Sequence, residues 1–224
     1  MKKTLTIFIL ILLSLTFVLA LCSCSDQSNN DWINGTKVEF GITDIKNPLV
    51  QITFSTGDTV RLELYPSVAP KTVENFLNLA KSGFYNGLTM HRIIESFMIQ
   101  GGGYKRSDSY LTETEKSANN IFGEFSQNGW SNNVSHRKGV ISMARATDYN
   151  SASSQFFICS VDCAFLDGQY SAFGRVIDEE SMSAVLKLSK VSTGAFPLKV
   201  GNSYMRMSDV PESAIDIVKI EVRD

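Results

Sequence analysis

Short runs in which apolar and polar residues alternate dominate the chain from residue 50 onwards. Val50, Ile52 and Phe54 alternate with polar residues, and the same period of two returns at residues 60–64 after the turn sequence STGD. A period of two places the apolar side chains on one face of a β-strand. The two runs therefore predict a hairpin with one buried face.

Further short strands are predicted along the chain, and only two segments are helical. The predicted strands span residues 89–94, 97–100, 140–144, 155–160, 172–176 and 215–222. One helix begins at Pro70, with Glu74 complementing its N-terminal dipole, and the other follows Asp178. Many short strands with two helices favour a mostly β fold, and we expect a closed eight-stranded antiparallel β-barrel capped by two α-helices.

A long polar segment, residues 104–137, separates the predicted strands in the middle of the chain. A loop of this length in a compact domain usually has a function. The sequence IFGEF at residues 121–125 is expected to be its ordered anchor.

The N-terminus has the pattern of an export signal. MKK precedes an apolar run over residues 5–21, which ends in LCSCS. The residues before Cys24 resemble the lipobox of bacterial lipoproteins, so Cys24 is the expected lipidation site. Two alternatives stay open: a cleaved secretory signal, or a retained transmembrane anchor, because the run is near the minimum length for spanning a bilayer.

We therefore expect three regions: a signal peptide at residues 1–23, a flexible tether at 24–46, and a folded domain at 47–224. A lipidated cysteine with two acyl chains suffices for stable anchoring. This predicts a lipid-anchored protein on the extracytoplasmic face of a bacterial cell membrane. The net charge of −2 and the absence of a basic patch argue against nucleic acid as a partner.

The cysteines and histidines of the predicted domain do not form a recognisable metal pattern. Cys159 and Cys163 have a C-x3-C spacing that fits no common zinc site, so we interpret Cys159 as a buried thiol of a predicted strand, with a disulfide as the alternative. His91 alternates with Arg92 in a predicted strand and should face its opposite side as a structural residue. No metal and no cofactor are expected.

One segment, MHRIIESFMIQGGG at residues 90–103, places Arg92 and Gln100 among apolar strand residues. Four segments resemble, in this order, the motifs of cyclophilin-type peptidyl-prolyl isomerases. They are the segment just quoted, ISMARA at 141–146, SQFFI at 154–158 and FLDGQYSAFGRV at 165–176. The resemblance runs from about residue 50 to the last predicted strand, over most of the predicted domain. It implies a cyclophilin-like fold and a substrate that is a proline-containing polypeptide.

The resemblance implies a function for the polar pair. Rotation about an X–Pro bond must overcome amide resonance, a barrier of about 18–20 kcal/mol. Arg92 matches the catalytic arginine of the family, whose guanidinium can donate to the prolyl nitrogen as resonance is lost. Gln100 matches the glutamine that orients this arginine and contacts the substrate backbone.

The resemblance also implies a substrate groove. Its expected residues are Phe97, Met98, Phe157 and Leu166 in the proline pocket, Ala144, Arg145 and Ala146 along the substrate backbone, Gln155 as a polar contact, and Phe165 and Tyr170 at the edge. The four pocket residues could equally be ordinary core residues.

Several positions depart from the family pattern. Glu95 and Ser96 replace a common Pro-Gly turn, and we expect Glu95 to point away from Arg92. Arg145 stands where the family often has Asn, and Tyr170 replaces a His. Phe165 replaces a Trp and lacks its N–H donor, which implies weakened cyclosporin binding.

Three functions are compatible with these features. The first is an isomerase, monomeric by default, that assists the folding of exported or surface proteins. The second is a membrane-displayed module that binds proline peptides or acts as a chaperone with little turnover. The third is a surface-displayed domain that serves mainly in adhesion or as a scaffold. The joint presence of Arg92, Gln100 and Phe157 favours the isomerase.

Overall fold

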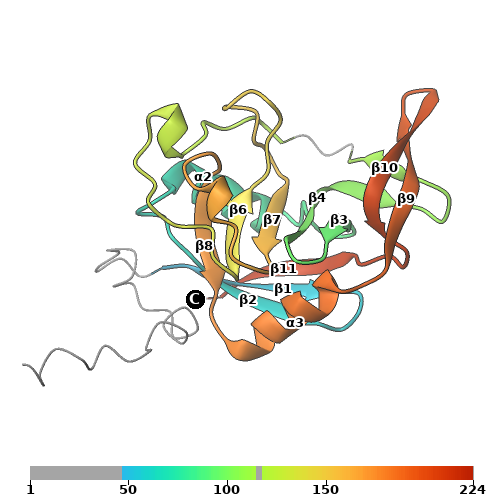
Figure 1. Ribbon diagram of the computed structural model, residues 1–224, viewed down its shortest axis with the longest axis horizontal. Helices are drawn as coiled ribbons and strands as arrows, with labels where there is room; N and C mark the ends of the chain where they lie inside the picture. Colours follow the sequence, from blue (N-terminus) through green and yellow to red (C-terminus); the bar gives the residue numbers. More distant parts are fainter. Residues whose placement is uncertain (1–46, 115–117, 224) are drawn as a thin grey trace, which may run out of the picture. The chain divides into compact units, whose positions relative to one another are not determined.

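A single sheet of eleven strands forms the framework of the protein (Figure 1). The computed structural model describes residues 47–114 and 118–223, so the predicted signal peptide, the tether and Cys24 lie outside the described residues. The strands are β1 Leu49–Phe54, β2 Thr59–Leu64, β3 Thr89–Ile94, β4 Met98–Arg106, β5 Leu111–Glu113, β6 Val140–Met143, β7 Phe156–Cys159, β8 Ala172–Val176, β9 Thr193–Val200, β10 Ser203–Pro211 and β11 Ile217–Arg223. The helices are α2 Pro70–Lys81 and α3 Glu179–Ser189, with short 3-10 turns η2 Ser126–Asn128 and η3 Ala164–Leu166.

The strand order confirms a mostly β fold with two helices and corrects the expected barrel. The hydrogen-bonded path runs β10-β9-β5-β4-β7-β6-β8-β2-β1-β11, with β3 paired to β4. The prediction of a closed eight-stranded barrel is wrong, because no ladder between described strands joins the two ends of this path. At the open seam an isolated bridge joins Thr89 of β3 to Asp216 just before β11, and main-chain hydrogen bonds such as that from Met90 N–H to the Ile215 oxygen, at 2.8 Å, lie beside it.

The core lies between α2 and the inner face of the sheet. Phe76 of α2 is fully buried and packs against Tyr85, Phe156 and Phe173, with ring centroids 5.2–5.6 Å apart. Helix α2 lies against β11, and α3 lies against β2. None of the described helices combines the length and the apolar character needed to cross a membrane.

The N-terminus of α2 is stabilised from a distant part of the chain. Pro70 is the first helical residue, as predicted, but Ala69 before it supplies no side-chain cap. Instead the buried carboxylate of Glu124 accepts hydrogen bonds from the main-chain N–H of Lys71 and Thr72, at 3.0 and 2.8 Å. These are two of the donors that a helix leaves without an internal partner.

Glu124 therefore takes the role that the sequence assigned to Glu74. Glu74 lies beyond the first turn and pairs with Lys71 across the helix surface, at 3.2 Å. Glu124 and Phe125 are buried, and Ile121 bridges Ala152, so the sequence IFGEF is the ordered anchor of the segment 104–137. The prediction of that anchor is confirmed.

The hairpin of β9 and β10 is not predicted by the sequence. Its residues are mostly exposed on both faces, so they show no period-two pattern, and Pro197 in β9 argues against a strand. Figure 1 shows this hairpin beside β3 and β4, reaching beyond them. It supplies residues to the groove described below that were not predicted from the sequence.

Candidate active site

A groove of about 470 Å³ brings together all but two of the residues predicted for the site. The predicted residues that line it are Arg92, Phe97, Met98, Gln100, Ala144, Arg145, Gln155, Phe157, Leu166 and Tyr170. Ala146 is exposed in the loop after β6 and does not line the groove. Phe165 is also outside the lining and is 65% exposed, but its ring lies 5.5 Å from that of Phe97.

The two residues predicted to act on the amide lie side by side. Arg92 of β3 and Gln100 of β4 are register partners in the antiparallel ladder. Arg92 Nη1 donates to Gln100 Oε1 at 3.5 Å, and Gln100 Nε2 donates to Gln155 Oε1 at 3.1 Å. This chain of amides holds the guanidinium at the wall of the groove.

A carboxylate that the sequence did not indicate also contacts Arg92. Asp209 of β10 places its Oδ2 3.7 Å from Arg92 Nε. Glu95, the acidic neighbour in the sequence, is exposed at the β3–β4 turn, as expected, and Ser96 beside it takes a left-handed conformation with φ +59°. The salt bridge leaves both side chains more than one third exposed, so it is accessible to water and to a bound peptide.

The floor of the groove is a compact apolar cluster. Met98, Phe157 and Leu166 pack with the buried side chains of Cys159 and Cys163. Both cysteines are buried and free, which confirms the interpretation of Cys159 as a buried thiol. Because these residues both line the groove and belong to a buried cluster, the floor of the groove is also an edge of the core.

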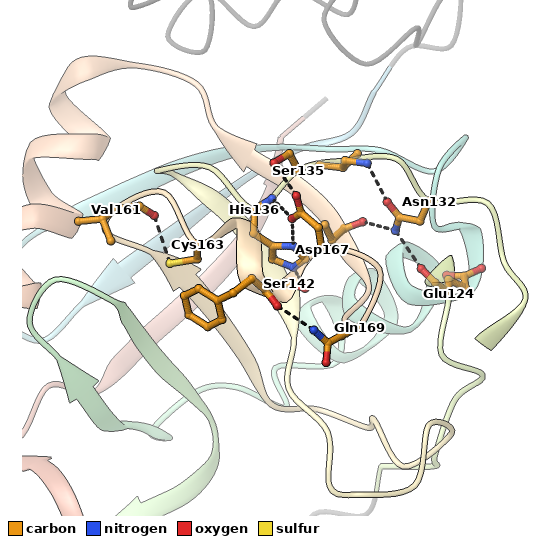
Figure 2. Close-up of polar contacts among 12 residues, drawn as sticks. Glu124, Asn132, Ser135, His136, Ser142, Val161, Cys163, Asp167 and Gln169 are labelled. Carbon is orange, nitrogen blue, oxygen red and sulfur yellow. Dashed lines mark hydrogen bonds and ion pairs between the residues drawn. The ribbon is translucent and has the colours of Figure 1, made fainter. Parts of the chain in front are cut away.

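A polar chain of Asp167, His136 and Ser142, which was not predicted, lies behind the groove floor. Figure 2 shows its three residues, of which His136 and Ser142 are buried while the side chain of Asp167 is 38% exposed. The His136 ring stacks on Phe157 with centroids 6.1 Å apart. His136 Nδ1 lies 2.9 Å from Asp167 Oδ1, and His136 Nε2 lies 3.0 Å from Ser142 Oγ. An Asp–His–Ser chain of this kind activates serine nucleophiles, but Ser142 is fully buried and out of reach of a substrate. We therefore assign the chain a supporting role.

The ionisation of this chain follows from the burial of His136 and from the hydrogen bonds that Asp167 accepts. Burial lowers the pKa of His136, although Asp167 opposes the change. Burial acts to raise the pKa of Asp167, but hydrogen bonds from His136 and Ser135 outweigh it, so that pKa is lowered. At neutral pH a neutral imidazole donates from Nδ1 to the Asp167 carboxylate and accepts the Ser142 hydroxyl at Nε2.

His91 lines the same groove as Arg92, and the prediction that it faces the opposite side is wrong. Met90 pairs with Gly101 and Arg92 with Gln100, so His91 is an extra residue in β3. Such a bulge breaks the alternation of side chains. His91 is nevertheless buried, with its ring 4.6 Å from that of Tyr104.

Burial of His91 predicts a loss of stability in mild acid. Burial lowers its pKa from 6.5 to about 4. Between these values the unfolded chain binds a proton that the folded protein excludes, so stability is full above pH 6.5 and falls as the pH drops towards 4. We expect the free energy of unfolding to fall by about 3 kcal/mol over this window from His91 alone.

Urea unfolding at a series of pH values from 7 to 4 measures this fall, and the His91→Gln variant should show a shallower one. His136, whose pKa is also lowered, should leave a residual slope of the same sign. An identical pH dependence in the parent and the variant would contradict the prediction.

Arg145 is held against the protein surface. Its Nε donates to the main-chain oxygen of Gln169 at 3.0 Å, and Nη1 donates to that of Ala146 at 2.9 Å. The guanidinium carbon lies 4.8 Å from the centre of the Tyr170 ring and 4.9 Å from that of Tyr149. These contacts fix the side chain at the rim of the groove.

Besides His91, four residues that line the groove were not predicted from the sequence. Tyr104, Arg206, Met207 and Ser208 complete the groove. Tyr104 lies in the part of β4 beyond the predicted strand, and the other three lie in the unpredicted hairpin, so no local pattern pointed to them. Within residues 47–114 and 118–223 no cluster of His, Cys, Asp and Glu could hold a metal ion.

The mostly β fold with its two helices, together with this groove, is cyclophilin-like. The family model described as cyclophilin type peptidyl-prolyl cis-trans isomerase/CLD matches residues 49–222. The chain belongs to this family, and it is a peptidyl-prolyl cis-trans isomerase.

Individual relatives agree with this assignment. The chain is 32% identical over 184 residues to a peptidyl-prolyl cis-trans isomerase of Acinetobacter baylyi, over 80% of this chain and 87% of the relative. It is 42% identical over 149 residues to peptidyl-prolyl cis-trans isomerase A of Dickeya dadantii, over 64% and 72%. Among solved structures, the cyclophilin type isomerase of Cryptosporidium parvum in the presence of the dipeptide Ala-Pro is similar, with a TM-score of 0.60 and 26% identity over 79% of this chain and 99% of that chain.

Proposed function

We propose that the groove binds an X–Pro segment of a polypeptide and that Arg92 assists rotation of its amide. The proline ring occupies the apolar floor, and the guanidinium donates to the prolyl nitrogen as the amide twists. That nitrogen gains a usable lone pair only when resonance is lost, so the hydrogen bond forms mainly in the transition state. An interaction that forms mainly in the transition state lowers the barrier to rotation of the amide.

The juxtaposition of Arg92 with the apolar floor is the observation that carries the proposal. Arg92, Met98 and Phe157 line one cavity, and Gln100 fixes the guanidinium through its hydrogen bond. A relative in the same family was solved in the presence of Ala-Pro, which supports a proline-containing substrate. No nucleophile is needed, because no covalent bond is broken.

Exchange of cis and trans signals tests the proposal directly. The full-length protein in detergent is mixed with an Ala-Pro peptide, and the exchange rate is measured by NMR, with the Arg92 variants described in the Discussion. Accelerated exchange that depends on Arg92 supports the mechanism. Peptide binding without accelerated exchange would leave a proline-binding module as the better description.

We further propose that the protein works on exported or surface proteins, anchored to the outer face of a bacterial cell membrane through lipidated Cys24. The lipobox-like sequence that ends at Cys24 and the polar residues 25–31 after it support this location. A polar tether would let the groove reach chains that emerge from the membrane.

Replacement of Cys24 by alanine tests the anchor. We expect the full-length variant, expressed in a bacterial host, to leave the membrane fraction, because no acyl chains can be attached. Cys22→Ala is the matched control and should stay in the membrane. Retention of the Cys24→Ala variant in the membrane would instead indicate that residues 5–21 remain as a membrane-spanning anchor.

A further inference from the structure

The β9–β10 hairpin forms one side of the substrate groove. Arg206, Met207 and Ser208 of β10 line the same cavity as Arg92 and Phe157. Strand β10 is an end strand of the sheet, and Figure 1 shows it on the side of β3 and β4. A peptide whose proline occupies the floor therefore lies next to β10.

The hairpin is fastened to the sheet as a fixed wall. Strand β5 pairs with β9 in parallel, with Leu111 opposite Leu198. Arg106 of β4 donates to the main-chain oxygens of Pro211 and Glu212, and its guanidinium lies 4.1 Å from the centre of the Phe196 ring. These contacts hold both strands of the hairpin.

A bulge in β10 directs the acidic residue of the hairpin to Arg92. Met207 pairs with Phe196 and Val210 with Gly194, so β10 carries one extra residue in this interval. Asp209 in the bulge has φ +60° and lies 3.7 Å from Arg92. Asp209 is the one acidic residue among positions 193–211, and its charge is offset by Arg92.

The side chains that line the groove carry a net positive charge. It contains Arg92, Arg145 and Arg206, and no carboxylate side chain of the described chain is part of it. Arg92 and Arg145 have protein partners. The side chain of Arg206 is exposed and makes no hydrogen bond or ion pair with another described residue, although its main chain belongs to the ladder between β9 and β10. Its charge is available to a ligand in the groove.

We propose that Arg206 forms a subsite that binds an acidic side chain of the substrate close to the isomerised X–Pro bond. The inference rests on the proposed function, because the proline must sit on the apolar floor for its neighbours to reach β10. A guanidinium forms charge-assisted, often bidentate hydrogen bonds with a carboxylate. Since Arg206 is exposed, the preference should be modest and sensitive to salt.

Matched peptides test the subsite. Every peptide contains one Ala-Pro bond, and the two peptides of a pair differ only in carrying Glu or its neutral isostere Gln at one position. The varied position is one of the two residues before Ala-Pro or one of the two residues after it. Dissociation constants come from NMR titration and kcat/KM from cis–trans exchange, with the full-length protein in detergent. We expect the Glu peptide to be favoured roughly fivefold at one position or more, and less at about 0.5 M salt.

Two variants identify the source of the preference. Arg206→Gln should bring the Glu-to-Gln ratio close to one, and Arg206→Glu should invert it. Arg223→Gln is the matched control, because Arg223 is an exposed arginine on β11 that pairs with Glu221 and does not line the groove. The control should retain the parental ratio.

The outcomes separate the subsite from the isomerase mechanism. A Glu preference in binding that Arg206→Gln removes supports the subsite even if exchange is not accelerated, which would count against the mechanism alone. Equal binding of the Glu and Gln peptides at every position overturns the subsite. A preference that persists unchanged in Arg206→Gln also overturns it.

Discussion

Replacing Arg92 by alanine is expected to lower kcat/KM for X–Pro isomerisation by roughly 10²–10³-fold, the usual effect of removing one positioned transition-state donor. The loss should fall mainly on kcat, because the donor acts on a nitrogen whose lone pair becomes available only as the amide twists. The apolar floor of Met98, Phe157 and Leu166 remains in the variant. Peptide binding, measured by NMR titration, should therefore change much less than the exchange rate.

Arg92→Lys is the matched control, because it keeps the positive charge and removes the planar donor fork. We expect its activity to lie between those of the parent and the alanine variant. The melting temperature should change little, since the Arg92 side chain is 39% exposed and its salt bridge with Asp209 is accessible to water. An alanine variant that retains turnover within about threefold of the parent would exclude arginine assistance as a main contribution.

The parts of the fold that were predicted from the sequence are those whose pattern is local. Strands β1, β2, β3 and β8 each have a buried face or are buried throughout, so apolar residues recur along them. The residues of the groove floor were predicted from the resemblance of their motifs to the cyclophilin family. Their spatial grouping came from the family resemblance, since no local rule brings β3 and the segment around Leu166 together.

The features that were missed depend on contacts between distant segments. The hairpin of β9 and β10 is exposed on both faces, so neither strand shows an alternating pattern. The contact of Asp209 with Arg92 requires both that hairpin and a bulge within it. Closure of a barrel likewise depends on whether the end strands meet, and hydrophobic periodicity contains no information on that point.

The capping of α2 by Glu124 is another contact of this kind, and it leads to a large expected effect on stability. Glu124→Ala removes the acceptor for the main-chain N–H groups of Lys71 and Thr72 and for the Thr72 hydroxyl. All three donors lie at a helix N-terminus, and Glu124 is fully buried. A buried donor left without a partner costs about 1–3 kcal/mol, so we expect a total loss of about 3 kcal/mol or more.

Thermal unfolding followed by circular dichroism should show this loss as a fall in melting temperature of about 10 °C. Glu124→Gln is the control, because it keeps one carbonyl acceptor for Thr72 or Lys71 and loses the charge that complements the helix dipole. Its loss should be smaller, and Glu74→Gln on the helix surface should be nearly neutral, since its pair with Lys71 is exposed. If Glu74→Gln destabilised the protein as much as Glu124→Ala, the carboxylate that stabilises the N-terminus of α2 would be that of Glu74, as the sequence alone suggested.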